Sequence, residues 1–389
     1  MRRLLLGILI TCLLCLAAAP GDGQTLAGGT PQRRTPRYKV MHMKNGQALI
    51  PAIRRQAAAG ATIPLWNYSV VSPLDHLTYT GQMVGRSPFY HGFRSTRIQS
   101  FLIPVRFVFS DGTVLDPTVS NACLAATTLS VVQNSPIFQT TDWVMNGVDV
   151  GTAQYIDGFQ RANFWSKVSV AGNSYHNSLA LTTLAKISVT VPAVDGGTTS
   201  FFCNEGQIDI NWWDALVENT ILPSLVSKGV GPTSVPIFLF DSVEMCDTSG
   251  CGILGYHNAF TPGGVLQTYS VSDFDNSGFY GGDISILAHE VGEWMDDPLG
   301  TNPTPAWGHV GQVQGCQNNL EVGDPLSGTP PALYSQSGIY GVTMPNGQKY
   351  YPQELAFFSW FYRQSPSMGA GGVYSDGGLF LGTAKGVCQ

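Results

Sequence analysis

The chain has 389 residues, a net charge of −6 and only 12% charged residues, with 45 glycines. The sequence shows neither a basic patch nor a basic amphipathic stretch, which argues against a nucleic-acid-binding protein and against a membrane-surface helix. Low charge with abundant glycine is typical of secreted proteins built from strands and loops.

The first residues predict export. Arg2 and Arg3 precede an apolar run over residues 4–16 and three alanines at 17–19, which is the pattern of a secretory signal peptide. We expect the signal to occupy residues 1–23 and the mature protein to be extracellular or periplasmic. No later apolar stretch approaches the roughly 20 residues that span a bilayer, so we expect no transmembrane anchor.

Six cysteines remain outside the apolar run of the signal: Cys123, Cys203, Cys246, Cys251, Cys316 and Cys388. An even number of cysteines in an exported chain predicts disulfides. Because Cys246 and Cys251 are close in sequence, we expect them to pair with each other.

The mature chain predicts an α+β protein in three parts. Residues 24–36 are expected to form a disordered linker, residues 37–198 a β-rich N-terminal region, and residues 199–389 a zincin-like, metalloprotease-like domain with a mixed sheet. The segment Asp195–Thr199 predicts a turn or a boundary, and the order of elements changes from Asn211 onward.

The β-rich region begins with a predicted hairpin. The apolar run Phe101–Phe109 and the segment Thr113–Leu115 flank the turn signal Asp111-Gly112. Farther along, residues 154–165 have the apolar period of an amphipathic helix, and residues 184–191 predict another strand.

The second region predicts a helix over Trp212–Leu225, a buried strand over Val235–Phe240 and a strand over Gly264–Ser270. A helix over 283–298 follows. This order is that of zincins, by analogy at the level of the fold.

Between the last strand and that helix, the segment from Asp273 to Gly278 begins like a calcium loop. Oxygen-bearing side chains alternate at Asp273, Asp275 and Ser277, and glycine is sixth. The twelfth position is Ile284 instead of glutamate, so a turn that leads into the helix is the competing interpretation. Calcium therefore enters as a second candidate ion, with Asp283 as a further oxygen donor.

The helix over 283–298 carries the motif H-E-x-x-E. His289 and Glu293 are four residues apart, so both lie on one helix face and can hold one ion, while Glu290 sits beside them. In the related H-E-x-x-H helix, two histidines bind zinc and the glutamate is the general base. The competing interpretation is a surface helix whose acidic side chains are solvated.

A catalytic zinc ion needs a third protein ligand and an open position. Glu321 is the preferred candidate, and Asp324, His257 and His309 are alternatives. Glu321 could equally be a carboxylate at a turn. Trp294 and the aromatic run 357–362 are expected in the core, with a substrate-binding wall as the alternative.

Several short motifs together resemble the EXORDIUM / phosphate-induced protein family. They are Cys246-x-x-x-x-Cys251 followed by Tyr256-His257-Asn258, the helix ending in Asp297-Pro298, the segment Leu320-Glu321-Val322-Gly323-Asp324, and Asn346-Gly347-Gln348-Lys349-Tyr350. The resemblance covers residues 154–389. It implies an exported, cell-wall-associated protein with a zincin-like architecture, and it does not imply peptidase activity.

Two functions follow as hypotheses. The first is a secreted zinc-dependent hydrolase, a metallopeptidase acting on a peptide or protein, with His289, Glu293 and Glu321 as ligands and Glu290 as general base. The second is a non-catalytic exported module that contacts a cell-envelope component and holds a structural metal or none. Stoichiometric metal with an open coordination position distinguishes them, because structural zinc sites are closed.

Overall fold

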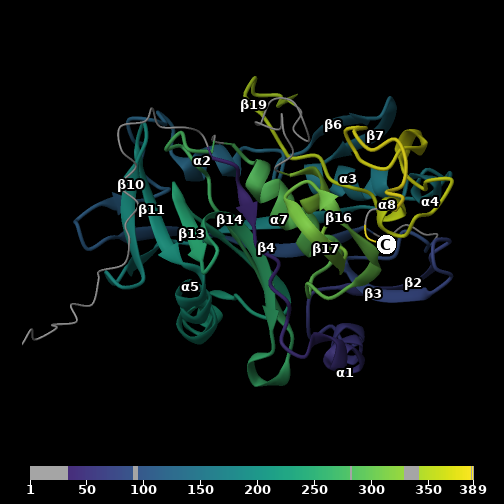
Figure 1. Ribbon diagram of the computed structural model, residues 1–389, viewed down its shortest axis with the longest axis horizontal. Helices are drawn as coiled ribbons and strands as arrows, with labels where there is room; N and C mark the ends of the chain where they lie inside the picture. The colour runs from purple at the N-terminus through teal and green to yellow at the C-terminus, as the bar shows by residue number, and fades with distance from the viewer. Residues whose placement is uncertain (1–33, 91–94, 281–282, 328–340, 387, 389) are drawn as a thin grey trace, which may run out of the picture. The chain divides into compact units, whose positions relative to one another are not determined.

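The computed structural model describes residues 34–90, 95–280, 283–327, 341–386 and 388 (Figure 1). The expected signal peptide at 1–23 and most of the expected linker at 24–36 lie outside these residues. Arg34 belongs to the fold, because its N–H donates to the carbonyl of Phe279 at 2.7 Å and its side chain pairs with Glu244 at 2.7 Å. The last part of the expected linker is therefore ordered.

A large mixed sheet is the centre of the protein. Its strands run in the order β10 (Gly196–Ser200), β11 (Asn204–Asp209), β13 (Val243–Asp247), β14 (Gly250–Phe260), β15 (Gln267–Ser272), β12 (Ser234–Leu239), β4 (Thr96–Val108) and β5 (Val114–Leu115). Three more strands join it: β1 (Arg37–Tyr38) pairs with β14, while β8 (Asn177–Thr183) and β9 (Ile187–Thr190) pair with β4. The predicted hairpin at 101–115 corresponds to β4 and β5, and Gly112 in its turn has a φ of 89°.

Among the described residues, four two-stranded hairpins stand apart from this sheet. They are β2 (Leu65–Val71) with β3 (Thr78–Val84), β6 (Thr141–Met145) with β7 (Val148–Ala153), β16 (Pro303–Val310) with β17 (Val313–Asn319), and β18 (Val342–Thr343) with β19 (Lys349–Tyr350). The hairpin β16–β17 bears on the candidate site, because the chain that leaves β17 passes beside the helix that carries the H-E-x-x-E motif.

The described helices are α1 (Gly46–Ala58), α2 (Thr128–Gln133), α3 (Tyr155–Asn163), α4 (Trp165–Val168), α5 (Ile210–Leu216), α6 (Leu222–Leu225), α7 (Ser285–Asp296) and α8 (Phe358–Phe361). The predicted helix at 154–165 corresponds to α3, and α4 begins at its last residue, Trp165. The predicted helix at 212–225 consists of α5, a wider π-helical turn at Val217–Ile221, and α6. Pro223 lies just after the wider turn and has no N–H to donate, so an ordinary helical ladder cannot run through it. Helices and strands together make the fold α+β, as predicted.

The expected division at residue 198 does not separate two domains. Strands β4, β8 and β9 come from before it, strands β11 to β15 come from after it, and all belong to one sheet. The described residues belong to one compact unit. Parallel pairing of β12 with β4 joins segments more than a hundred residues apart, and such pairing leaves no local mark in the sequence.

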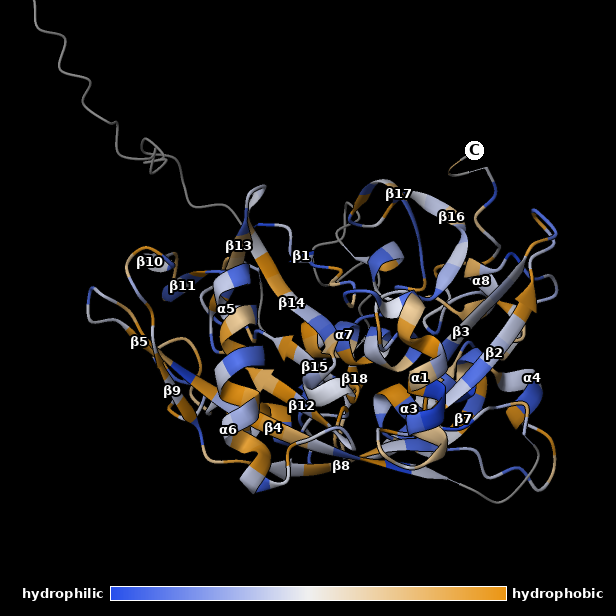
Figure 2. Cartoon of the chain, turned by 90° about the horizontal axis from the view of Figure 1, so that it is seen from below, coloured by the Kyte–Doolittle hydropathy of each residue, from blue (hydrophilic) through white to orange (hydrophobic). Residues whose placement is uncertain are grey.

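Side-chain alternation divides the core between the two faces of the sheet. On β4, Phe101 and Ile103 pack into a cluster that includes Trp213 of α5. Leu102, between them, packs into the cluster that includes Phe159 of α3 and Val291 of α7. Strands β4, β12 and β14 are correspondingly rich in hydrophobic residues (Figure 2). Helices α5 and α6 thus cover one face, and α3 and α7 cover the other.

All twelve residues of α7 are buried, so the interpretation of this segment as a solvated surface helix is wrong. The helix packs on β14 and β15 (Figure 2). Its N-cap is Ile284, which makes no side-chain capping bond, although Asp283 and Ser285 on either side are of residue types that often cap helices. Asp297 ends the helix before Pro298 in a non-helical conformation, as the proline predicts.

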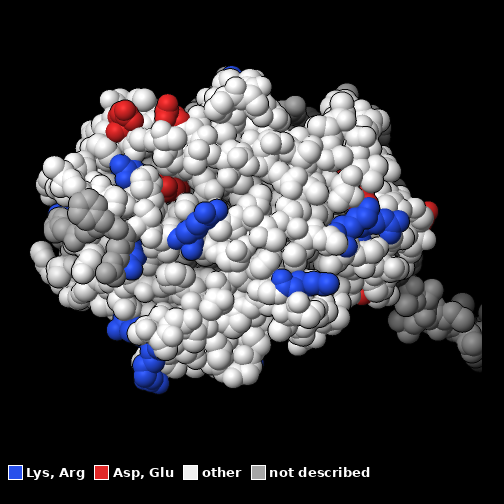
Figure 3. Space-filling model, turned by 180° about the vertical axis from the view of Figure 1, so that it is seen from behind, with Lys and Arg blue, Asp and Glu red and all other residues white. Residues whose placement is uncertain are grey.

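The six cysteines form three disulfides: Cys123–Cys203, Cys246–Cys251 and Cys316–Cys388. The local pair predicted from sequence is present, and three disulfides fit an exported protein. In the part of the chain that the structure describes, no helix is long and apolar enough to cross a bilayer. On the face drawn in Figure 3, basic side chains are scattered across a mostly uncharged surface.

The aromatic run near the C-terminus is core. Phe357, Phe358, Trp360, Phe361 and Tyr362 are each at most 2% exposed. Trp294 of α7 is also fully buried, and its indole N–H donates to Thr268. These side chains stabilise the fold behind the motif helix and line no open wall.

Candidate metal centre

Helix α7 places His289 and Glu293 one turn apart on the same face. The His289 Nε2 atom lies 3.0 Å from Glu293 Oε1. Two ligands of a tetrahedral zinc ion with bonds of about 2.0–2.2 Å lie about 3.4 Å apart. The pair therefore has the spacing that a shared ion requires.

The third group is Asp324, at the start of the short 3-10 turn Asp324–Leu326 that follows β17. Its Oδ1 atom lies 3.5 Å from His289 Nε2. One ligand atom each of His289, Glu293 and Asp324 lie within 4.8 Å of one another, and all three residues are buried. The backbone N–H groups of Gly323 and Asp324 donate to Glu293 Oε1 at 3.1 and 3.2 Å, which fixes the turn against the helix.

Glu321, the preferred third ligand from sequence, does not belong to this close group. Its Oε1 atom accepts a hydrogen bond from Asn319 at 2.9 Å, and its side chain is fully buried. Burial raises the pKa of Glu321, and the neighbouring Glu293 raises it further. Asp324, and not Glu321, shares the close group with His289 and Glu293.

Hydrogen bonds orient the His289 ring. Gln353 donates from Nε2 to the carbonyl of Gly323 at 2.7 Å, which leaves its Oε1 atom 3.2 Å from His289 Nδ1. His289 therefore donates from Nδ1, and its Nε2 faces the two carboxylates. Metal-binding histidines are held in this way by an acceptor on the far nitrogen. Sequence reasoning missed Gln353, because nothing local marks it.

His257, on β14, is also held by a hydrogen bond on one ring nitrogen, while its other ring nitrogen faces carboxylates. Its Nε2 atom donates to the carbonyl of Asp297 at 2.9 Å, and burial lowers its pKa to about 4, so the ring is neutral. Its Nδ1 atom has no hydrogen-bond partner among the described residues and lies 3.6 Å from Glu290 Oε2 and 3.9 Å from Glu293 Oε2. A lone pair facing carboxylate oxygens is favourable only with a proton or a cation between them.

Glu290 is fully buried, and neither of its oxygens has a hydrogen-bond donor among the described residues. Burial raises its pKa. A glycine of β14 makes room for it: a Cβ at Gly255 would lie 2.5 Å from Glu290 Oε1. A Cβ at Gly323 would likewise lie 2.3 Å from His289 Nδ1. Both glycines are needed for close approach to the motif side chains.

The N-terminal segment covers the group. The Tyr38 ring stacks on His289, and Gln312 accepts from the Tyr38 N–H at 2.8 Å and also bonds Asp324. Lys39 pairs with Asp247 at 2.9 Å. Each motif side chain is at most 4% exposed, so the centre is closed to solvent.

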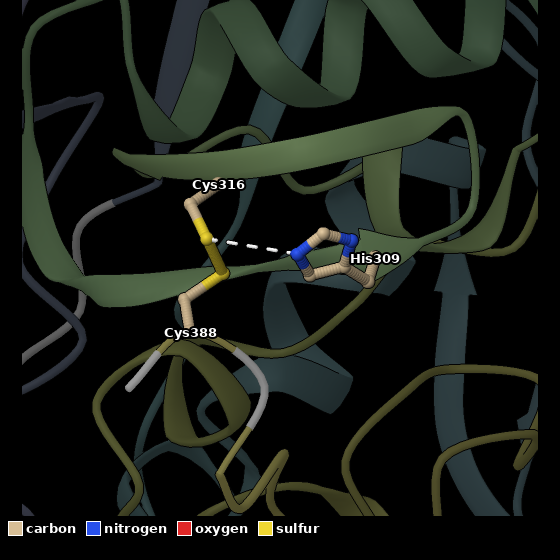
Figure 4. A group of neighbouring side chains, drawn as sticks. All are labelled: His309, Cys316 and Cys388. Carbon is tan, nitrogen blue, oxygen red and sulfur yellow. Dashed lines mark hydrogen bonds between the residues drawn. A yellow bond between two sulfur atoms is a disulfide. The ribbon is translucent and has the colours of Figure 1, made fainter.

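His309, another candidate ligand, lies elsewhere. It is exposed, and its Nε2 atom is 3.9 Å from the sulfur of Cys316, which is bonded to Cys388 (Figure 4). The metal ligand among sulfur groups is the thiolate, and a disulfide has none to offer. This cluster is therefore a disulfide with a neighbouring imidazole.

No protein-family model, curated protein or solved structure matches the chain. The resemblance to the EXORDIUM family thus stays a prediction from its short motifs. What this chain can do chemically therefore has to follow from its own side chains.

Proposed function

We propose that the chain is an exported zinc-dependent hydrolase of zincin-like design that acts on peptide bonds. His289, Glu293 and Asp324 would hold the zinc, with Glu321 and Gln353 supporting Glu293 and His289. The support is chemical: two imidazole nitrogens and three carboxylates converge in a buried volume, where their mutual repulsion disfavours the empty arrangement.

The burial of Glu290 without a hydrogen-bond donor among the described residues is the observation that best supports the proposal. A structural zinc site needs no extra carboxylate, yet this chain buries one beside the ligands without a donor for either oxygen. Such burial costs free energy, and carboxylates buried at this cost are concentrated at functional sites. Zinc bound by its neighbours would polarise the scissile carbonyl. Glu290 would take the proton of the attacking water and return it to the leaving amine.

The pairing of β1 favours a peptide substrate. Arg37 and Tyr38 lie in register with Ile253 and Gly255 of β14, so an extended polypeptide already runs past the centre. An extended substrate would bind a sheet in the same way, through main-chain hydrogen bonds. In the described state the chain's own segment holds that position, and a substrate has to displace it.

The test compares protein made without a histidine tag as wild type, Tyr38→Ala, Glu290→Gln and the remote control Glu218→Gln. We expect chelator-sensitive cleavage of a mixed protein substrate by wild type or by Tyr38→Ala. Glu290→Gln, made in the more active of these two backgrounds, should retain zinc and lose on the order of 10²-fold or more in rate. If neither background cleaves anything in a chelator-sensitive manner, the chain is no hydrolase.

Burial of the centre favours a second candidate, a non-catalytic exported module with a closed structural metal. Such a module fits the resemblance to the EXORDIUM family and would contact a cell-envelope component. Cobalt(II) substituted for zinc distinguishes the two: the visible spectrum of an open centre responds to added anions that bind metals, whereas that of a closed centre does not.

A further inference from the structure

A second cluster of carboxylates lies away from the candidate metal centre. Asp273 and Asp275 belong to the segment between β15 and α7, and Glu205 belongs to β11, far away in the sequence. One oxygen of each residue lies within 4.8 Å of the others. The three side chains are at most 1% exposed.

Backbone donors orient the two aspartates. Asp275 accepts from the N–H groups of Ser277 at 2.9 Å and Tyr280 at 2.8 Å, and Asp273 Oδ1 accepts from the N–H of Val243 at 2.9 Å. These contacts also fix where the remaining oxygens point.

The remaining oxygens have no donor. Both oxygens of Glu205 and the Oδ2 atom of Asp273 lack a hydrogen-bond partner among the described residues. The Ser277 hydroxyl lies beside Glu205, but its single proton goes to Asp275. A buried carboxylate with no donor, aimed at two others, is unfavourable without a positive charge between them.

A further carboxylate close enough to act on Glu205 and Asp273, Glu244, already has its own cation. Arg34 binds Glu244, which also accepts from Gln207 and Tyr280, so the charge of Glu244 is compensated. When ionised, Glu205 and Asp273, whose oxygens lack donors among the described residues, carry a charge that this pair does not offset. A divalent cation would balance most of it.

We propose that Glu205, Asp273 and Asp275 bind one calcium ion. Only oxygen is offered, which favours a hard cation over zinc. Magnesium demands near-ideal octahedral geometry and keeps several waters, whereas calcium accepts irregular cages of carboxylates and carbonyls. The loop pattern in the sequence marked Asp273 and Asp275. Glu205 supplies the acid that the pattern lacks at Ile284, and Asp283 is not in the cluster.

The ion would join β11 to the segment that leads into α7. Asn204, the first residue of β11, follows Cys203, which is bonded to Cys123. The calcium site would therefore stabilise the fold and hold the start of the motif helix. It uses no residue of the candidate zinc centre and does not depend on the proposed function.

The test is thermal unfolding of protein treated with EGTA and then titrated with calcium or magnesium. We expect calcium to raise Tm saturably with one ion per chain, and magnesium to have much less effect. Glu205→Gln should lose this calcium response while its Tm without calcium equals or exceeds that of wild type, because one repelling charge is gone. A folded but calcium-insensitive Glu205→Gln thus separates a lost site from a lost fold.

Two controls complete the test. The surface variant Asp142→Asn should respond to calcium like wild type, and His289→Ala should keep the response even if zinc is lost. The proposal is overturned if calcium does not change the Tm of EGTA-treated wild type at millimolar concentration, or if Glu205→Gln responds as wild type does.

Discussion

The phenol ring of Tyr38 lies parallel to the imidazole of His289, with ring centroids 3.6 Å apart and planes 7° from parallel. This contact joins a segment near the start of the described chain to the helix that carries the motif. It closes the candidate metal centre, and it makes access to that centre depend on one short strand of two residues, β1.

Replacing Tyr38 with alanine should open the centre. The stacked ring shields His289, so its loss should make a chelator remove zinc faster and should raise any chelator-sensitive cleavage. The measurement is the rate of zinc transfer to a coloured chelator. Tyr90→Ala removes an exposed tyrosine and should leave that rate unchanged; equal rates for all three proteins would show that Tyr38 does not control access.

The third ligand can be assigned by comparing Asp324→Ala with Glu321→Gln. Asp324 lies within ligand distance of His289 and Glu293, so its loss should reduce bound zinc well below one per chain. Glutamine at 321 keeps an acceptor for Asn319 and should retain zinc. Metal analysis of both variants decides the matter. Zinc kept by Asp324→Ala and lost from Glu321→Gln would make Glu321 the ligand.

A methyl group at position 323 should disturb the centre. The Cβ of Gly323→Ala would lie 2.3 Å from His289 Nδ1, closer than real contacts allow, so the ring or the turn must move. We expect lower zinc content and a lower Tm, with a loss of roughly 1–3 kcal/mol. Gly315→Ala is the control, since its Cβ meets nothing within 4 Å. Equal zinc content and equal Tm in Gly323→Ala and Gly315→Ala would contradict the close approach of Gly323 to His289.

Asp241 should make stability depend on pH. Burial raises its pKa to about 6, above the ordinary value of 3.8. Between these values the unfolded chain loses the proton while the folded chain keeps it, so the contribution of Asp241 to stability falls as pH rises and stays unfavourable above 6. The full effect is on the order of 2–3 kcal/mol.

Asp241→Asn removes that charge and keeps the acceptor, because Thr128 and Asn276 both donate to Oδ1. Urea unfolding at constant calcium should show the variant more stable relative to wild type at pH 7.5 than at pH 4. A stability difference that does not change with pH would show that Asp241 titrates normally.

The sequence predicted the part of the centre that is local. His289, Glu290 and Glu293 lie within five residues, and helical periodicity alone brings His289 and Glu293 together. Asp324 was named only as an alternative, because its distance from His289 depends on how the chain leaves β17. Gln353 and Tyr38 could not be predicted, since they reach His289 from elements that only the tertiary fold brings near.

The fold, too, could be predicted only where its signals are local in the sequence. The apolar runs at β4 and β12 predicted strands, but their parallel pairing is non-local and made the expected boundary at residue 198 wrong. The calcium-like loop indicated Asp273 and Asp275. Glu205 comes from β11, so the pattern had no position at which to expect it.

Metal content is the most direct test of the proposed centre. Protein purified without a histidine tag should contain one zinc per chain by elemental analysis, and His289→Ala should contain none while keeping its three disulfides. Wild type that folds, is offered zinc and still binds less than a tenth of an equivalent would contradict the zinc centre and the hydrolase built on it.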